Sequence, residues 1–155
     1  MWLVRARLLT VTVWVGSVWT IGYLVAPTLF ATLADRVLAG TIAGSLFRIE
    51  AWLTVACAAI LLIMQALRPV MASTKQKKIF TALVWGMLAC TLVGYFGLQP
   101  MMAALRSEAG GAAMQGAART QFGILHGAAA GFYLLQSLLG IALVVRCNEA
   151  QVPRV

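Results

Sequence analysis

The chain has 155 residues, of which 62% are hydrophobic and 10% are charged, and its net charge is +8 at pH 7. Soluble domains carry about 25% charged residues, so this composition excludes a soluble globule and leaves room for about four membrane spans of ~20 residues. No nucleic-acid partner is expected despite the positive charge, because the basic residues cluster between apolar runs, as topology signals do. The three cysteines have no paired spacing, which predicts no disulfide framework.

The apolar runs are long and show no period of two, so the predicted fold class is all-α, a four-helix transmembrane bundle that forms a single domain over residues 1–155. The first span is expected over residues 8–30. It is too long for a signal peptide, whose apolar region has about 7–15 residues. Pro27 should kink its far end. One helical face of this span carries small and polar residues, namely Thr12, Gly16, Trp19 and Tyr23.

The second span is expected over residues 46–67, although its helix can begin as early as Asp35 because no breaker intervenes. The stretch "FRIEAW" at 47–52 puts two charges at the mouth of this span, Arg48 and Glu50. Arg48 can extend to the lipid headgroups, as long basic side chains do. Glu50 either caps the span toward water or has a partner inside the bundle. It starts a polar helical face that continues through Thr54, Cys57 and Leu61.

The third span is expected over residues 79–105. Gln99 adds a polar group toward its end, and Pro100 adds a kink at a depth similar to that of Pro27. Two kinks at one depth, on different spans, favour an opening in that half of the bundle.

The fourth span is expected over residues 121–145, after a glycine-rich link at 107–116. A stripe of small residues on this span permits close packing of helices, and it consists of Gly123, Gly127 and Gly131. The stripe either packs against a neighbouring span or forms a homo-oligomer interface. His126 lies beside the stripe. It is either a hydrogen-bonded structural residue or a functional one, since ionisable groups inside membranes are rare.

Basic residues divide unequally between the two ends of the expected bundle. Eight fall at the end that carries both termini: Arg5, Arg7, Arg68, Lys75, Lys77, Lys78, Arg146 and Arg154. Four fall at the other end: Arg36, Arg48, Arg106 and Arg119. The positive-inside rule then predicts that both termini are cytoplasmic and that "FRIEAW" lies at the outer face.

Polar side chains on the four spans are expected to meet in a cavity in the outer half of the bundle, with Glu50 above the others. The candidate ligand-binding residues are Tyr23, Arg48, Glu50, Gln99 and His126. A metal-site hypothesis uses Glu50, Cys57 and His126, whose ligand types suit zinc or copper. No catalytic residues are predicted, because the sequence contains no phosphate loop, dinucleotide-binding turn or paired-cysteine zinc motif.

Four stretches in chain order carry a family resemblance: "WVGSVWTIGYLVAPTLFATL", "AGTIAGSLFRIEAW", "GLQPMMAALR" and "FGILHGAAAGFYLLQSLLG". Together they resemble the bacterial branch of the transmembrane protein 205-like family, over nearly the whole chain. The resemblance implies a multi-pass protein of the bacterial inner (plasma) membrane with four helices. It implies no established reaction and no catalytic residues.

Two other small membrane families have a similar build, the copper-resistance D-type proteins and the four-helix protoporphyrinogen oxidases. They would imply copper or haem. The chain departs from both, since it has one histidine where haem bound by two histidines needs a second, and it has no Met-x-x-Met repeat.

Three functions therefore remain open. The favoured one is a non-catalytic membrane protein that binds a small ligand or a protein partner in the outer-half cavity. The second is metal-ion handling or small-solute transport by an oligomer. The third is a redox protein linked to haem or porphyrin. The cofactor is unknown, with none expected and haem, copper or zinc as alternatives. The lipid bilayer is the first expected partner.

Overall fold

The computed structural model describes residues 2–67, 74–108 and 115–149, and within these ranges it contains helices and no strand. The helices join into rods, and those long and apolar enough to cross a membrane, among the described residues, number four: Trp2–Thr32, Arg36–Leu67, Thr74–Glu108 and Gly116–Cys147. The predicted all-α four-helix fold is therefore confirmed. Each expected span lies inside one of these longer rods.

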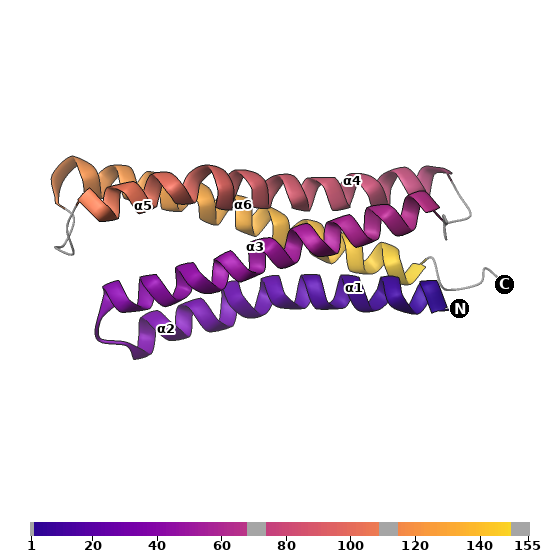
Figure 1. Ribbon diagram of the computed structural model, residues 1–155, viewed down its shortest axis with the longest axis horizontal. Helices are drawn as coiled ribbons and strands as arrows, with labels where there is room; N and C mark the ends of the chain where they lie inside the picture. Colours follow the sequence, from indigo (N-terminus) through magenta and orange to yellow (C-terminus); the bar gives the residue numbers. More distant parts are fainter. Residues whose placement is uncertain (1, 68–73, 109–114, 150–155) are drawn as a thin grey trace.

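Consecutive rods run in opposite directions (Figure 1), so the start of the first and the end of the last lie at the same end of the bundle. We call this the terminal end, and the opposite one, where residues 33–35 join two rods, the far end. The elements in chain order are α1 (Trp2–Trp19), η1 (Thr20–Val25), α2 (Ala26–Thr32), α3 (Arg36–Leu67), α4 (Thr74–Thr91), η2 (Leu92–Leu98), α5 (Gln99–Glu108) and α6 (Gly116–Glu149).

Helix α3 begins well before the expected span, and Asp35 sets its start. The Asp35 carboxylate accepts hydrogen bonds from the backbone N–H groups of Val37 at 2.8 Å and Leu38 at 3.1 Å. A side chain that pairs these otherwise unsatisfied donors is a helix N-cap. Because the helix starts at Arg36, Glu50 lies about 21 Å along it at 1.5 Å per residue, and so not at its mouth.

A π-helical segment lies beside each of the two prolines at which a kink was expected. The segment η1 comes directly before α2, whose second residue is Pro27, and η2 comes directly before α5, whose second residue is Pro100. Proline lacks the N–H that an α-helix uses, and π turns are places where helices bend and widen. A π turn holds an extra residue, so it rotates the helix faces that follow it relative to those before it.

The expected polar face of the first span does not pack against the apolar core. Thr12, Gly16 and Trp19 are exposed. The buried face of α1 lies on the other side and carries Val11, Trp14, Val15 and Val18.

The apolar core fills the half of the bundle nearer the terminal end. Its buried members come from α1, α3, α4 and α6: Val11, Trp14, Val15, Val18, Cys57, Ala58, Leu61, Phe80, Val84, Met87, Leu143 and Cys147. Close helix approach occurs here at Gly140, where an added Cβ would meet Val15 Cγ1 at 3.2 Å and Met87 Cε at 3.5 Å.

The glycine stripe of the fourth span lies elsewhere. Among the described residues, an added Cβ at Gly123, Gly127 or Gly131 would meet nothing within 4 Å apart from the helix itself and the adjoining residues, and all three glycines are exposed. The stripe therefore makes no close contact with a neighbouring rod of the described chain. The homo-oligomer interface stays a prediction.

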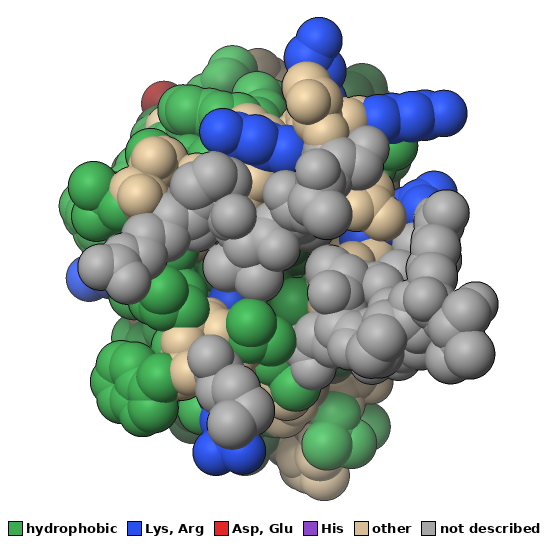
Figure 2. Space-filling model, turned by 90° about the vertical axis from the view of Figure 1, so that its right-hand side faces the viewer, with side chains coloured by type: hydrophobic (Ala, Val, Ile, Leu, Met, Phe, Trp, Pro, Cys, Tyr) green, Lys and Arg blue, Asp and Glu red, His purple; other side chains and the backbone are tan. Residues whose placement is uncertain are grey.

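Basic side chains gather at the terminal end, where Figure 2 shows lysines and arginines projecting around the rim. Those at the described ends of α1, α4 and α6 are Arg5, Lys75, Lys77, Lys78 and Arg146. Arg68, Arg154 and most of the expected glycine-rich link at 107–116 lie outside the described residues. The side of the membrane that this end faces stays a prediction.

Candidate functional site

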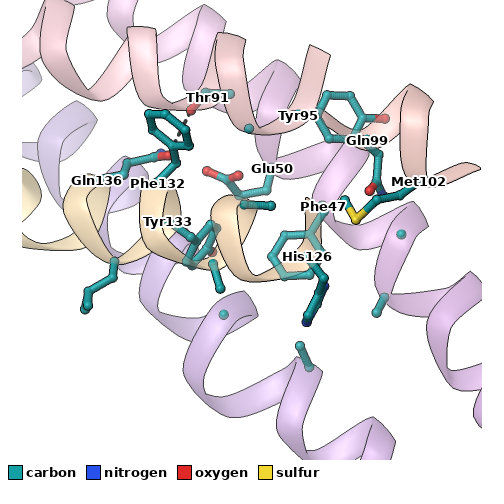
Figure 3. Close-up of a pocket in the computed structure, with 18 of the residues that line it drawn as sticks. Phe47, Glu50, Thr91, Tyr95, Gln99, Met102, His126, Phe132, Tyr133 and Gln136 are labelled. Atoms are coloured by element: carbon teal, nitrogen blue, oxygen red, sulfur yellow. Dashed lines mark hydrogen bonds between the residues drawn. The ribbon is translucent and has the colours of Figure 1, made fainter. Parts of the chain in front are cut away.

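A cavity of about 530 Å³ lies among the rods on the far-end side of the apolar core. This volume falls within the range of about 300–1,000 Å³ that small-molecule sites occupy. Figure 3 shows the main side chains that line it, from α3, α4, η2, α5 and α6: Phe47, Glu50, Thr91, Tyr95, Gln99, Met102, His126, Phe132, Tyr133 and Gln136. The first rod adds Gly22, Tyr23, Ala26, Pro27 and Phe30.

The carboxyl group of Glu50 is the central polar group of this cavity. Glu50 is only 3% exposed. Its Oε1 accepts a hydrogen bond of 2.8 Å from the Thr54 hydroxyl. The same Thr54 oxygen accepts one of 2.8 Å from the indole N–H of Trp14, which is fully buried in the core. These two bonds hold the carboxyl group at a fixed place between the core and the cavity.

An aromatic wall stands beside Glu50, and Tyr133 is its centre. The Tyr133 hydroxyl donates a hydrogen bond of 2.6 Å to the backbone carbonyl of Val18. Its ring packs edge-to-face with Phe47 at 5.4 Å and with Tyr23 at 6.3 Å between ring centres. The Tyr23 hydroxyl donates to the Ser137 hydroxyl oxygen at 2.9 Å. The wall therefore ties α1, η1 and α3 to α6.

A second buried polar group of the cavity comes from α6. Gln136 is 2% exposed, and its Oε1 lies 3.0 Å from the Thr91 hydroxyl, which can donate to it. The Gln136 Nε2 is buried and has no hydrogen-bond partner among the residues that the structure describes. A buried amide without a partner costs about 1–3 kcal/mol, which marks this group as one that a ligand or water can satisfy.

The far-end part of the cavity carries the basic groups. The Arg106 guanidinium lies over the Phe122 ring, 5.0 Å from its centre. The His126 ring stacks on the same Phe122 ring at 6.0 Å, with an angle of 7° between the ring planes. His126 is exposed in the described bundle. Both basic groups therefore contact one aromatic ring near the end of the bundle.

Four of the five candidate ligand-binding residues line this one cavity: Tyr23, Glu50, Gln99 and His126. The fifth, Arg48, is exposed and does not line it, because a side chain two residues from Glu50 on a helix points in a different direction.

The order in depth also differs from the expectation. Glu50 lies next to Tyr133 (Figure 3), and His126 lies seven residues before Tyr133 on α6, or ~10 Å nearer the far end. Glu50 is therefore the deeper group.

The structure gives no support to the metal-site hypothesis. Among the described residues, no group of three His, Cys, Asp or Glu side chains lies close enough to hold a metal ion. Cys57 is buried in the apolar core and does not line the cavity, whereas His126 lies toward the far end. Glu50, Cys57 and His126 are therefore not brought together.

Sequence reasoning missed three polar side chains: Trp14, Thr91 and Gln136. A glutamine in the middle of an apolar run is a signal for Gln136, because uncharged amides are also costly in lipid. Nothing in the sequence shows that the Trp14 indole reaches Thr54, since that contact depends on how α1 and α3 rotate against each other.

The fold and the site together define a multi-pass membrane protein whose helices enclose a mostly apolar cavity with one deep carboxyl group. The chain belongs to the family described as "Domain of unknown function (DUF4149)", whose model matches residues 9–111. The matched range covers most of the first rod and all of the second and third, and α6 lies outside it. No curated protein and no solved structure matches the chain.

Proposed function

We propose that this protein binds a small ligand in the cavity beside Glu50 and carries out no reaction on it. The observation that supports this most strongly is the Glu50 carboxyl group, 3% exposed and lining a cavity of about 530 Å³ inside a bundle of membrane-spanning helices. Ionisable groups are costly at this depth and mark functional sites by default. An apolar cavity with a few convergent polar groups is the usual form of a small-molecule site.

The proposal places the protein in the bacterial inner membrane with both termini in the cytoplasm. The basic rim of the terminal end supports this orientation, because cytoplasmic loops carry an excess of lysine and arginine. The cavity then opens toward the outer side. The resemblance to the transmembrane protein 205-like family supports the same location.

A substitution that fills the cavity tests the proposal. In Gly44→Leu on α3, the new Cβ lies 3.7 Å from Gln99 Nε2, so the rest of the leucine side chain occupies the cavity. We expect small molecules that co-purify with the wild-type protein in mild detergent to fall at least about tenfold in this variant, because one residue now takes their place. Mass spectrometry of solvent extracts measures them.

Ser45→Leu is the matched control, because Ser45 is the next residue, is exposed and does not line the cavity. It adds the same side chain to the lipid-facing side and should retain the co-purified molecules. Circular dichroism should show unchanged helix content in both variants. Equal recovery of the same molecules from Gly44→Leu and wild type would contradict the proposal, as would the recovery of none from wild type.

A further inference from the structure

We propose that the ligand is a hydrophobic organic monocation and that it exchanges for a proton on Glu50. This inference rests on the proposed function and assigns the class of ligand.

The Glu50 carboxyl group has no basic partner among the described residues. The hydroxyl of Thr54 is the one polar partner of Glu50 among the described residues, and no ion pair joins Glu50 to a basic side chain there. A charge inside a bundle is stable only when it is paired and hydrogen-bonded, and otherwise the group takes up a proton. Glu50 therefore becomes an ion only when a cation arrives beside it.

Several other titratable groups lie on the elements around Glu50. Those on the elements packed against it are Tyr23 on η1, Cys57 on its own helix, Cys90 on α4, Tyr95 on η2, Arg106 on α5, and His126 and Tyr133 on α6. Tyrosines and cysteines are neutral near pH 7 in the absence of a partner that ionises them. The single carboxyl group thus allows the cavity to neutralise one positive charge.

Arg106 and His126 would repel a cation if they lay beside Glu50. His126 is seven residues before Tyr133 on α6, or ~10 Å along the helix, and Arg106 contacts Phe122, which is eleven residues before Tyr133, or ~16 Å. Glu50 lies at the level of Tyr133 (Figure 3). Both basic groups therefore line the cavity on the far-end side of Glu50 and do not lie beside it, and the deep part of the cavity carries the carboxyl group.

The walls of the cavity around Glu50 are rich in aromatic rings. Rings line the cavity around Glu50, and the labelled ones in Figure 3 are Phe47, Tyr95, Phe132 and Tyr133. The face of an aromatic ring attracts a cation by about 0.5–2 kcal/mol, more when water is excluded, and also binds apolar groups. A small metal ion is usually held by several ligand side chains, and among the described residues no three His, Cys, Asp or Glu side chains gather to hold one. A bulky apolar cation matches both the rings and the volume.

The binding step is an exchange that conserves charge. The protonated carboxyl group of Glu50 loses its proton to solvent, and the cation takes its place beside the resulting carboxylate. No bond other than the O–H bond breaks, and no electron is transferred. Because proton and cation compete for one group, cation affinity should fall as the pH is lowered.

A matched pair of probes tests this inference on the full chain in mild detergent. Tetraphenylphosphonium is a hydrophobic monocation, and tetraphenylborate is an anion of nearly the same shape. We expect the cation to bind at least about tenfold more tightly than the anion, after subtraction of binding to empty micelles. Equilibrium dialysis measures both. A pH indicator in weakly buffered solution should register about one proton released per bound cation.

Glu50→Gln keeps the shape of the side chain and removes its charge. It should weaken tetraphenylphosphonium binding at least about tenfold and abolish proton release. Glu108→Gln is the matched control, because Glu108 is exposed at the end of α5, and it should bind as wild type does. Glu50→Asp retains a carboxyl group and should retain proton release, which keeps the test valid if the glutamine variant fails to fold.

The outcomes separate this inference from the proposed function. Equal binding of the two probes, or unchanged cation binding by folded Glu50→Gln, would overturn the proposal that the ligand is a monocation. If neither probe binds while Gly44→Leu still loses co-purified molecules, the monocation is wrong and the ligand-binding function stands. If neither probe binds and wild type yields no such molecules, both are wrong.

Discussion

Gly22→Ala is expected to lower the free energy of unfolding by about 3 kcal/mol, because among the described glycines an added Cβ makes its shortest contact here. An added Cβ at Gly22 would overlap the Tyr133 ring, with Cζ at 2.8 Å and a still shorter approach to Cε1. The Tyr133 ring cannot simply swing away. Its hydroxyl is bonded to the Val18 carbonyl, and the rings of Phe47 and Tyr23 pack against it.

The variant therefore has to break the bond to Val18 or push α6 away from η1. Either change also opens the wall of the cavity. Denaturation in a titration with sodium dodecyl sulfate, followed by circular dichroism, measures the loss. Adding Tyr133→Ala to Gly22→Ala should make the effect of the alanine at position 22 nearly vanish, because the ring with which it collides is then absent.

Gly16→Ala is the matched control on the same rod. An added Cβ at Gly16 meets nothing within 4 Å among the described residues. This substitution should leave stability unchanged or raise it by about 0.5–1 kcal/mol, because alanine loses less backbone entropy in a helix. If Gly16→Ala and Gly22→Ala had equal effects, the packing of Tyr133 on η1 would be wrong.

Thr54→Val should lower the free energy of unfolding by about 2–3 kcal/mol, although valine has nearly the same shape as threonine. The substitution removes the hydroxyl that accepts from the Trp14 indole and donates to Glu50. Thr54 is 0% exposed, so water does not replace the lost partner. Both the indole N–H and the carboxyl oxygen would then be buried without the bonds that they make now.

The same titration measures this effect, and Thr54→Ser is its control because serine keeps the hydroxyl. The serine variant should lose only the small contribution of one buried methyl group, about 1 kcal/mol. The valine variant should also shift Trp14 fluorescence, since the indole loses its hydrogen-bond acceptor. Equal stability of the valine variant and wild type would show that the Trp14–Thr54–Glu50 chain does not form.

The helix periodicity and the rare polar residues predicted much of this architecture. Polar side chains inside apolar runs are expensive, so Tyr23, Glu50, Gln99 and His126 each had a reason to face inward, and all four line the cavity. The polar face of α3 was also correctly placed: Thr54 is buried behind Glu50. These inferences need only one helix at a time.

The errors came from features that one helix does not specify. The early start of α3 near Asp35 was anticipated, but Glu50 was placed at the mouth of the span because the span was counted from residue 46 and not from that start. The packing face of α1 is formed by its apolar residues, and Thr12, Gly16 and Trp19 are exposed. Cys57 shares a face with Glu50, yet it packs in the core because the cavity ends between them. The partners of Trp14 and Gln136 required the arrangement of whole rods.

The central claim is that the Glu50 side of α3 faces an accessible cavity while the opposite side faces lipid. The most direct test uses a background in which Cys57, Cys90 and Cys147 are replaced by alanine. Phe47→Cys introduces a thiol that faces the cavity, and Ile49→Cys introduces one on the exposed side, where Ile49 is now 64% exposed.

A small cationic methanethiosulfonate reagent added to the outside of intact cells labels thiols that water reaches. The account predicts that Phe47→Cys reacts at least about tenfold faster than Ile49→Cys, because lipid excludes a charged reagent from the exposed side of the helix. Faster labelling of Ile49→Cys, or no labelling of Phe47→Cys from the outside, would contradict it.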